Sequence, residues 1–229
     1  MKVYFIGAGP GDPELITVKG KKTIEMSGYC IYAGSLVNAD ILKYCSKDTR
    51  IYDSASMSLE EIVNVIEEAR DDNKDVARVH TGDPSIYGAI QEQMSELDKR
   101  GIDYEVIPGV SSFLAAASTL KQELTLPGVS QTVIITRIEG RTPVPETEGL
   151  ETLAKSKATL CIFLSVSEIK KVVDILEPAY GTNCPVAIVY KASWKDEKVI
   201  ISNLSDVADE ITRNDIKKTA IIIVGDVLS

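Results

Sequence analysis

The sequence feature that most constrains the fold is the run Gly7-Ala8-Gly9-Pro10-Gly11-Asp12-Pro13, which follows the short apolar stretch Val3-Tyr4-Phe5-Ile6. An apolar run of this length predicts a buried strand. Glycines at every second position allow a tight turn and a close backbone approach. Asp12 and Pro13 are typical of a helix N-cap and of the first helical position, so we expect a helix over residues 13–26. The chain therefore begins as strand, glycine loop and helix, the start of an α/β unit.

The same run departs from the dinucleotide-binding pattern G-x-G-x-x-G. Asp12 stands where the third glycine would allow close packing, and its carboxylate disfavours a pyrophosphate at the helix N-terminus. The next predicted strand, residues 29–33, lacks the acidic residue that would bind the ribose of NAD. We therefore expect a glycine loop at a strand's carboxyl end, but not one for NAD. A glycine turn of purely structural purpose is the alternative.

Two later segments repeat this design. A strand predicted over residues 75–80 leads into Gly82-Asp83-Pro84, and one over residues 103–107 leads into Pro108-Gly109-Val110-Ser111-Ser112. Strands that alternate with helices indicate parallel βαβ units, whose ligands bind outside the carboxyl ends of the strands. Asp83 and the two serines also suit helix caps, so a structural role competes with a binding role. The helix expected after Pro84 carries an apolar stripe made of Ile86, Ile90, Met94 and Leu97.

The second half of the chain reads as another α/β domain. Turn residues around positions 121–129 suggest a connection, so we predict an N-terminal domain over residues 1–120 and a C-terminal domain over residues 121–229. The loop over residues 137–146 contains two arginines and two prolines, which bar regular structure there. Strands are predicted over residues 132–136, 159–164, 185–190 and 219–224, and helices over residues 166–177 and 204–213.

Charge and cysteine content exclude several classes of function. A net charge of −9 without a basic stripe argues against a nucleic-acid partner, and an anionic substrate would need local basic residues. No apolar run approaches the roughly 20 residues of a membrane span. Four scattered cysteines and a single histidine, His80, make metal ligation improbable and are typical of free thiols in a reducing cytoplasm. His80 lies at the end of a predicted strand, and both a structural role and a proton-handling role stay open for it.

Taken together, the three glycine-containing loops and the strand at Ala220 stand in the order and spacing of the tetrapyrrole (class III) methyltransferases, which the whole chain resembles. The resemblance implies two α/β domains with an active-site cleft between them, S-adenosylmethionine as cofactor, S-adenosylhomocysteine as product and a homodimer. Residues 131–137, 140–146 and 189–194 are similar to those members that methylate precorrin-4, with or without cobalt, at C11 in cobalamin biosynthesis. The alternatives are another tetrapyrrole C-methylation, at C2/C7 of uroporphyrinogen or at C17, and a non-catalytic nucleotide-binding module.

The resemblance also implies the site residues, while no catalytic side chain is assigned. Methyl transfer from a sulfonium needs mainly orientation, which is worth roughly 7–11 kcal/mol of barrier. Many relatives have a Tyr-Met pair where this chain has Phe163-Leu164, so a methionine side-chain contact is lost there. Candidates for binding the substrate carboxylates are Arg137, Arg141, Lys191 and Lys195. The implied cofactor contacts are Pro10, Thr81, Gly82, Asp83, Ile86, Ser111, Ser112, Phe163, Leu164, Ala192 and Ala220.

Overall fold

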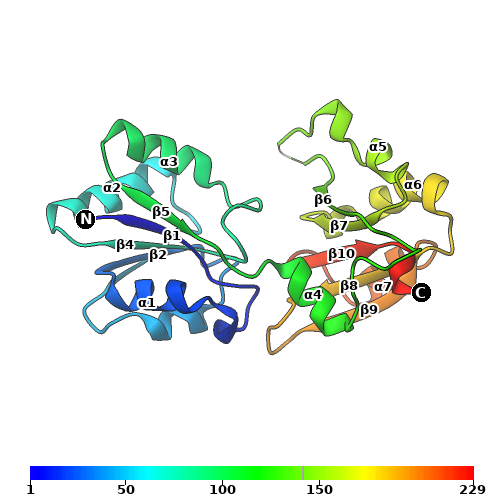
Figure 1. Cartoon of the computed structure of the whole chain (residues 1–229), viewed down its shortest axis with the longest axis horizontal. Coiled ribbons are helices and arrows are strands. Elements are labelled where there is room, and N and C mark those ends of the chain that lie inside the picture. The colour runs from blue at the N-terminus through cyan, green and yellow to red at the C-terminus, as the bar shows by residue number, and fades with distance from the viewer. Residues whose placement is uncertain (141) are drawn as a thin grey trace. The chain divides into compact units, whose positions relative to one another are not determined.

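The computed structural model describes residues 1–140 and 142–229. Its contacts divide the chain into two units, Met1–Ser112 and Phe113–Ser229, each built on its own sheet (Figure 1). The α/β class predicted from the sequence is confirmed for both units. The predicted domains, residues 1–120 and 121–229, stay a prediction.

The first unit contains a five-stranded sheet in the order β3-β2-β4-β1-β5, and each neighbouring pair is parallel. The parallel arrangement predicted from alternating strands and helices is confirmed for this unit. The strand β3 was not predicted, because it has only four residues and begins and ends on a charged residue. The strands are β1 (Val3–Gly7), β2 (Tyr29–Tyr32), β3 (Arg50–Asp53), β4 (Val76–His80) and β5 (Tyr104–Ile107).

Three α-helices cover the first sheet: α1 (Val18–Met26), α2 (Leu59–Asp71) and α3 (Ile90–Lys99), with short 3-10 helices η1 (Pro13–Leu15) and η2 (Ala39–Tyr44). The single helix predicted over residues 13–26 is wrong: Asp12 caps only η1, and Thr17 caps α1 as a new helix. Ile86 was also placed on a helix, whereas α3 begins at Ile90, because Ala89 has left-handed backbone angles.

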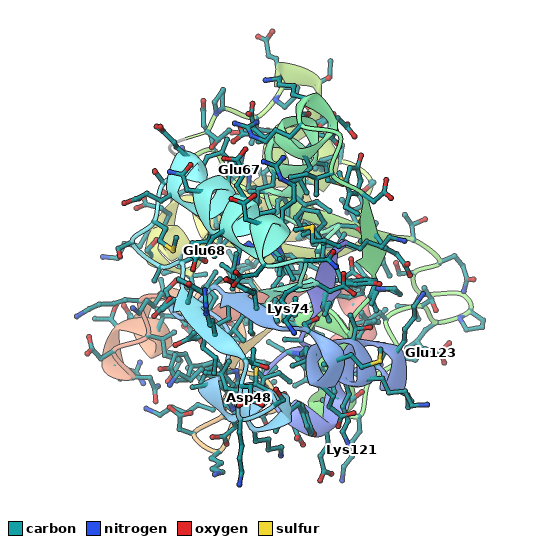
Figure 2. All side chains as sticks on the ribbon, turned by 90° about the vertical axis from the view of Figure 1, so that its left-hand side faces the viewer. Asp48, Glu67, Glu68, Lys74, Lys121 and Glu123 are labelled. Carbon is teal, nitrogen blue, oxygen red and sulfur yellow. The ribbon has the colours of Figure 1, made fainter. Side chains whose placement is uncertain are left out.

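Helices cover both faces of the sheet, and both faces are apolar. Val3, Phe5 and Val76 pack with the inner faces of α2 and α3, while Ile6, Ala77 and Val79 pack against the α1 and η2 side. The capping box at Ser58 starts α2, whose polar side carries Glu67 and Glu68 (Figure 2). Alternate residues of β4 therefore point to opposite faces, and both faces are buried, as expected for a central parallel strand.

The second unit contains a mixed sheet in the order β6-β7-β10-β8-β9. Strands β6 and β7 are parallel, but β10 is antiparallel to both β7 and β8, and β9 is antiparallel to β8. The second sheet therefore combines parallel and antiparallel pairs, unlike the first. The strands are β6 (Val133–Arg137), β7 (Thr159–Phe163), β8 (Pro185–Tyr190), β9 (Lys198–Asn203) and β10 (Ala220–Val224).

The second sheet also has a helical layer on each face. Leu160, Ile162 and Val186 pack with α5, α6 and α7, whereas Cys161, Ala187 and Val189 pack with α4. The helices are α4 (Ser112–Leu120), α5 (Leu150–Ala154), α6 (Ile169–Tyr180) and α7 (Val207–Arg213), with 3-10 turns η3 (Glu146–Glu148), η4 (Val166–Glu168) and η5 (Asp226–Leu228). No helix in the described parts of the chain is long and apolar enough to cross a membrane.

Candidate active site

The loops that follow β1, β4 and β5 meet at one edge of the first sheet. Because β4, β1 and β5 are parallel neighbours, their carboxyl ends lie together. Gly9 and Gly82 form a two-residue bridge, in which Gly82 N donates to Gly9 O at 2.8 Å and Gly9 N donates to Gly82 O at 3.3 Å. The prediction that these loops share an edge is confirmed within this unit.

Glycine is required in these loops because their backbones touch. A Cβ added to Gly7 would lie 2.6 Å from both Gly109 Cα and Gly82 O, and a Cβ added to Gly109 would lie 2.2 Å from Gly82 O. Real Cβ atoms do not approach other atoms that closely, so any side chain would push the loops apart. The structural interpretation of the glycines is therefore correct. The close backbone contacts that they permit also hold the three loops together.

Asp83 ties the second loop to the third. Its Oδ1 accepts from Ser85 N at 2.8 Å, and its Oδ2 accepts from Gly109 N at 2.9 Å. Each carboxylate oxygen has two lone pairs, so both keep acceptor capacity for a ligand. The helix-cap role weighed for Asp83 in the sequence is wrong, because α3 begins only at Ile90. Asp83 instead holds its own turn and the third loop, and it leaves room for the binding role. Beside it, Pro10, Gly82 and Ser111 are buried, and Thr81, Ile86 and Ser112 are half-buried.

The second unit has a corresponding edge. Strands β6, β7 and β8 end there and β10 begins there, because β10 runs antiparallel to its neighbours. Ala220 lies opposite Tyr190, and Lys191 N donates to Thr219 O at 2.8 Å. The predicted residues of this unit that the structure describes all lie at this edge or on the loop that leaves it: Arg137, Phe163, Leu164, Lys191, Ala192, Lys195 and Ala220.

Backbone strain concentrates at this second edge. Leu164, Lys191, Ser193 and Thr219 have φ values of +54°, +47°, +68° and +58°. Non-glycine residues rarely adopt such angles, and they persist where the surrounding structure fixes them, often at ligand sites. Leu164 is also 66% exposed, although it is apolar, whereas Ala192 is buried. An exposed leucine on a fixed loop, next to small side chains, is suited to form the wall of a binding site for an apolar group.

The basic residues of this edge are largely engaged in the structure. Arg137 donates to the carbonyls of Ile138, Thr142 and Pro143 at 3.1–3.2 Å and thereby folds its own loop. Lys191 donates to Asp196 at 2.6 Å, and its ammonium lies 5.1 Å from the Trp194 ring centre.

The hydrogen bond with Asp196 raises the pKa of Lys191 and lowers that of its partner, so both are charged at neutral pH. Lys195 is exposed. Arg141 lies outside the described residues, so its predicted role is not examined by the structure.

Sequence reasoning weighed a role for His80 in the first unit but missed its neighbour Arg78. Arg78 and His80 stand on the central strand β4 and are both 5% exposed. Together with Gln93 they line a cavity of about 350 Å³. A charged residue in the middle of an otherwise apolar strand was the available signal. Among the described residues, no cluster of histidine, cysteine and acidic side chains is suited to hold a metal ion.

Comparison with known proteins gives a consistent result. The profile of the family described as Tetrapyrrole (Corrin/Porphyrin) Methylases matches residues 2–208. A cobalt-precorrin-4 C(11)-methyltransferase of Methanocaldococcus jannaschii is 60% identical over 229 residues, covering 100% of this chain and 88% of the relative. A precorrin-4 C(11)-methyltransferase of Pseudomonas aeruginosa is 47% identical, covering 100% of this chain and 91% of the relative.

Solved structures extend the likeness to the fold. The crystal structure of a cobalt-precorrin-4 methyltransferase, described as a cobalamin biosynthetic enzyme, superposes with a TM-score of 0.97 at 47% identity and covers 100% of this chain and 96% of that one. A uroporphyrin-III C-methyltransferase from Thermus thermophilus, solved with S-adenosylhomocysteine, superposes with a TM-score of 0.80 at 25% identity, covering 100% of this chain and 93% of that one.

Proposed function

Since the chain belongs to the tetrapyrrole (corrin/porphyrin) methylase family, we propose that it transfers a methyl group from S-adenosylmethionine to C11 of precorrin-4 or cobalt-precorrin-4. It is an S-adenosylmethionine-dependent methyltransferase of cobalamin biosynthesis. The observation that carries the regiochemistry is the 60% identity over the whole chain to a C11 enzyme, against 31% to a uroporphyrinogen-III C-methyltransferase of the same organism. The C11 activity implied by the sequence resemblance is confirmed, and the non-catalytic module is excluded.

The residues at both edges fit the cofactor. S-adenosylmethionine supplies an already activated methyl group, so the protein's task is to bind and orient. At the first edge, the remaining lone pairs of Asp83 suit ribose hydroxyls or an amino group. At the second edge, exposed Leu164 suits a flat apolar ring, and Ala192 and Ala220 leave space beside it.

We assign cofactor binding to the loop residues implied by the resemblance: Pro10, Thr81, Gly82, Asp83, Ile86, Ser111, Ser112, Phe163, Leu164, Ala192 and Ala220.

Substrate binding is assigned to Arg137, Arg141, Lys191 and Lys195, because a polycarboxylate substrate needs local cations on a chain of net charge −9. The bonds of Arg137 to its own loop carbonyls support a second role for it, that of shaping the loop. Lys191 can exchange Asp196 for a substrate carboxylate, since an exposed pair of this kind is worth under about 1 kcal/mol.

The protein is further proposed to be a cytoplasmic homodimer. The dimer is implied by the family resemblance. The location is supported by the four cysteines, which are all unpaired and three of which are buried, as is typical of a reducing compartment.

The experiment that tests the function is incubation of the purified protein with labelled S-adenosylmethionine and, separately, precorrin-4, cobalt-precorrin-4 and uroporphyrinogen III. We expect label at C11 of one or both precorrin-4 forms and none in uroporphyrinogen III. Label at C2 or C7 of uroporphyrinogen III, or no transfer to any of the three, would overturn the assignment. The comparison of the two precorrin-4 forms also decides whether cobalt is part of the substrate.

A further inference from the structure

Arg78 is a buried cation, and no described residue places an anion beside it. Its Nε donates to Gln93 Oε1 at 2.9 Å and its Nη1 donates to Ile31 O at 3.3 Å, and both acceptors are neutral. Within the described residues, no carboxylate lies within 4.0 Å of it. Burial lowers its pKa to about 10, so the guanidinium stays charged at neutral pH. Burying an unpaired charge is costly, and structural stability alone does not explain it.

The unused part of the guanidinium faces the cavity. The Nη2 atom of Arg78 donates to no described residue. It is nevertheless not fully buried, because among the described residues only His80 Nε2 is a buried side-chain nitrogen or oxygen without a partner. Nη2 therefore keeps accessible surface, and the surface that Arg78 lines is the cavity of about 350 Å³. That volume has room for one edge of a macrocycle with its side arms, not for a whole tetrapyrrole.

His80 adds a neutral polar group to the same wall. It stands two residues after Arg78 on β4, so both side chains project from the same face of the strand. Burial and the nearby Arg78 lower the pKa of His80 to about 3, which keeps the ring uncharged. The exposed Glu92 also lines the cavity but makes no ion pair with Arg78 among the described residues. The fixed charge of the inner wall is therefore positive.

We propose that Arg78 binds a peripheral carboxylate of the tetrapyrrole substrate in this cavity, an inference that rests on the proposed function. A corrin precursor carries carboxylates around an apolar ring, and the cavity pairs its cation with the apolar side chains of Leu36, Met57 and Ile62. The cofactor also has a carboxylate, but its ammonium and sulfonium groups would be brought toward a guanidinium. The substrate is therefore the better source of the anion.

The test compares Arg78→Met, Arg78→Lys and Gln93→Met with the wild type, with the precorrin-4 form that the wild type methylates as the probe. Arg78→Met should raise KM about tenfold or more and change kcat less than threefold. Its affinity for S-adenosylhomocysteine, measured by calorimetry, should stay within twofold. Its thermal midpoint should not fall, because an uncompensated buried charge is removed. Arg78→Lys keeps the charge and should give an intermediate KM.

Gln93→Met separates binding from structure, because it removes the side-chain partner of Arg78 and leaves the cation. If Arg78 served only to hold Gln93, the Arg78→Met and Gln93→Met variants would lose the same stability and both would keep the wild-type KM, which would overturn the proposal. A fivefold or greater loss of S-adenosylhomocysteine affinity in Arg78→Met would assign the anion to the cofactor and also overturn it. If Arg78→Met does not fold, an unchanged KM in Arg78→Lys decides against the proposal.

The wild type separates failure of this inference from failure of the function. A wild-type protein that methylates neither precorrin-4 form would remove both together. A wild type that methylates normally, beside an Arg78→Met variant with unchanged KM, would remove only the role of Arg78.

Discussion

At the scale of single residues, the glycines of the first edge show how backbone contact dictates residue type. Gly109 has no room for a Cβ, since the added atom would lie 2.2 Å from Gly82 O. We expect Gly109→Ala to lower the free energy of unfolding by about 2–4 kcal/mol, through strain in a packed backbone. The matched control is Gly140→Ala, where nothing lies within 4 Å of the added Cβ. Chemical denaturation followed by circular dichroism measures both, and equal stabilities would contradict the packing argument.

Asp83 combines a structural and a binding role, and substitution separates them. Asp83→Asn keeps one acceptor oxygen and the shape of the side chain, but it loses the charge and one of the two backbone hydrogen bonds. Loss of a hydrogen bond to a charged group costs about 1.5–3 kcal/mol. We therefore expect about tenfold or more weaker binding of S-adenosylhomocysteine, together with a measurable loss of stability. Calorimetric affinity equal to that of the wild type would remove Asp83 from the cofactor site.

His80 makes a pH-dependent contribution to stability. Its pKa is lowered to about 3 in the folded protein, from about 6.5 in an unfolded chain. Only the unfolded state takes up this proton as the pH falls through 6.5, so stability from the neutral ring is present above that pH and lost progressively toward pH 3. One such group contributes a loss of about 1.4 kcal/mol between pH 7.5 and 5.5.

The chain has one histidine, which makes this contribution measurable. The difference in unfolding free energy between pH 7.5 and 5.5 should be about 1.4 kcal/mol smaller in His80→Gln than in the wild type. Other groups that titrate in this range, such as the N-terminal amine, cancel in the comparison. The same pH dependence in both proteins would show that the pKa of His80 is not lowered in the folded state.

At the scale of elements, the strained edge of the second unit holds Leu164 on a fixed loop. Asparagine tolerates left-handed backbone angles better than leucine does. We expect Leu164→Asn to leave the unfolding free energy unchanged or to raise it by up to about 1 kcal/mol, while S-adenosylhomocysteine binds several-fold more weakly. Lys157→Asn is the matched control, because Lys157 also has a positive φ, +52°, but precedes β7 at the opposite end of the strand.

The control should gain the same stability and keep the wild-type affinity. If Leu164→Asn binds S-adenosylhomocysteine as tightly as the wild type, Leu164 is not part of the cofactor site.

The elements also show how far the sequence could be interpreted. Strand β8 was predicted with the bounds that the structure gives, because Pro185–Tyr190 is a nearly uninterrupted apolar run. Strand β9 was missed, since it lies at a sheet edge and only Ile200 among its residues is buried. Charged residues that lead into Val199 made the segment look like the end of a loop. Apolar runs in the sequence thus predicted interior strands. Edge strands depend on tertiary pairing, which a single sequence does not contain.

The site residues also divide into those that the sequence could predict and those that it could not. The glycine loops and Asp83 were predicted because turns and caps have local residue requirements. Arg78 was not singled out, because its significance depends on the absence of an anionic partner among the described residues, and that is a tertiary property. Likewise, the bonds of Arg137 to Thr142 and Pro143 could not be derived from spacing.

At the scale of the whole molecule, the net charge determines which residues can bind an anionic substrate. A chain of net charge −9 repels a polycarboxylate at long range, so recognition must come from cations close to the substrate. Screening reduces the repulsion beyond about 10 Å at 0.1 M salt and affects buried pairs much less. A buried guanidinium such as Arg78 is therefore better suited to an acidic protein than a larger exposed basic patch would be.

The last prediction concerns the proposed homodimer. Strand β9 is the edge of its sheet, and its Val199 and Ile201 are 41% and 70% exposed on one face. Unpaired edge strands with exposed apolar side chains tend to associate unless they are covered. We expect the wild type to sediment at equilibrium as a dimer at micromolar concentration, and Ile201→Lys to shift it toward monomer, because a charge would be buried at the contact. Val18→Lys, at a similarly exposed apolar residue of α1, should stay dimeric. A monomeric wild type would refute the dimer, and a dimeric Ile201→Lys variant would place the interface elsewhere.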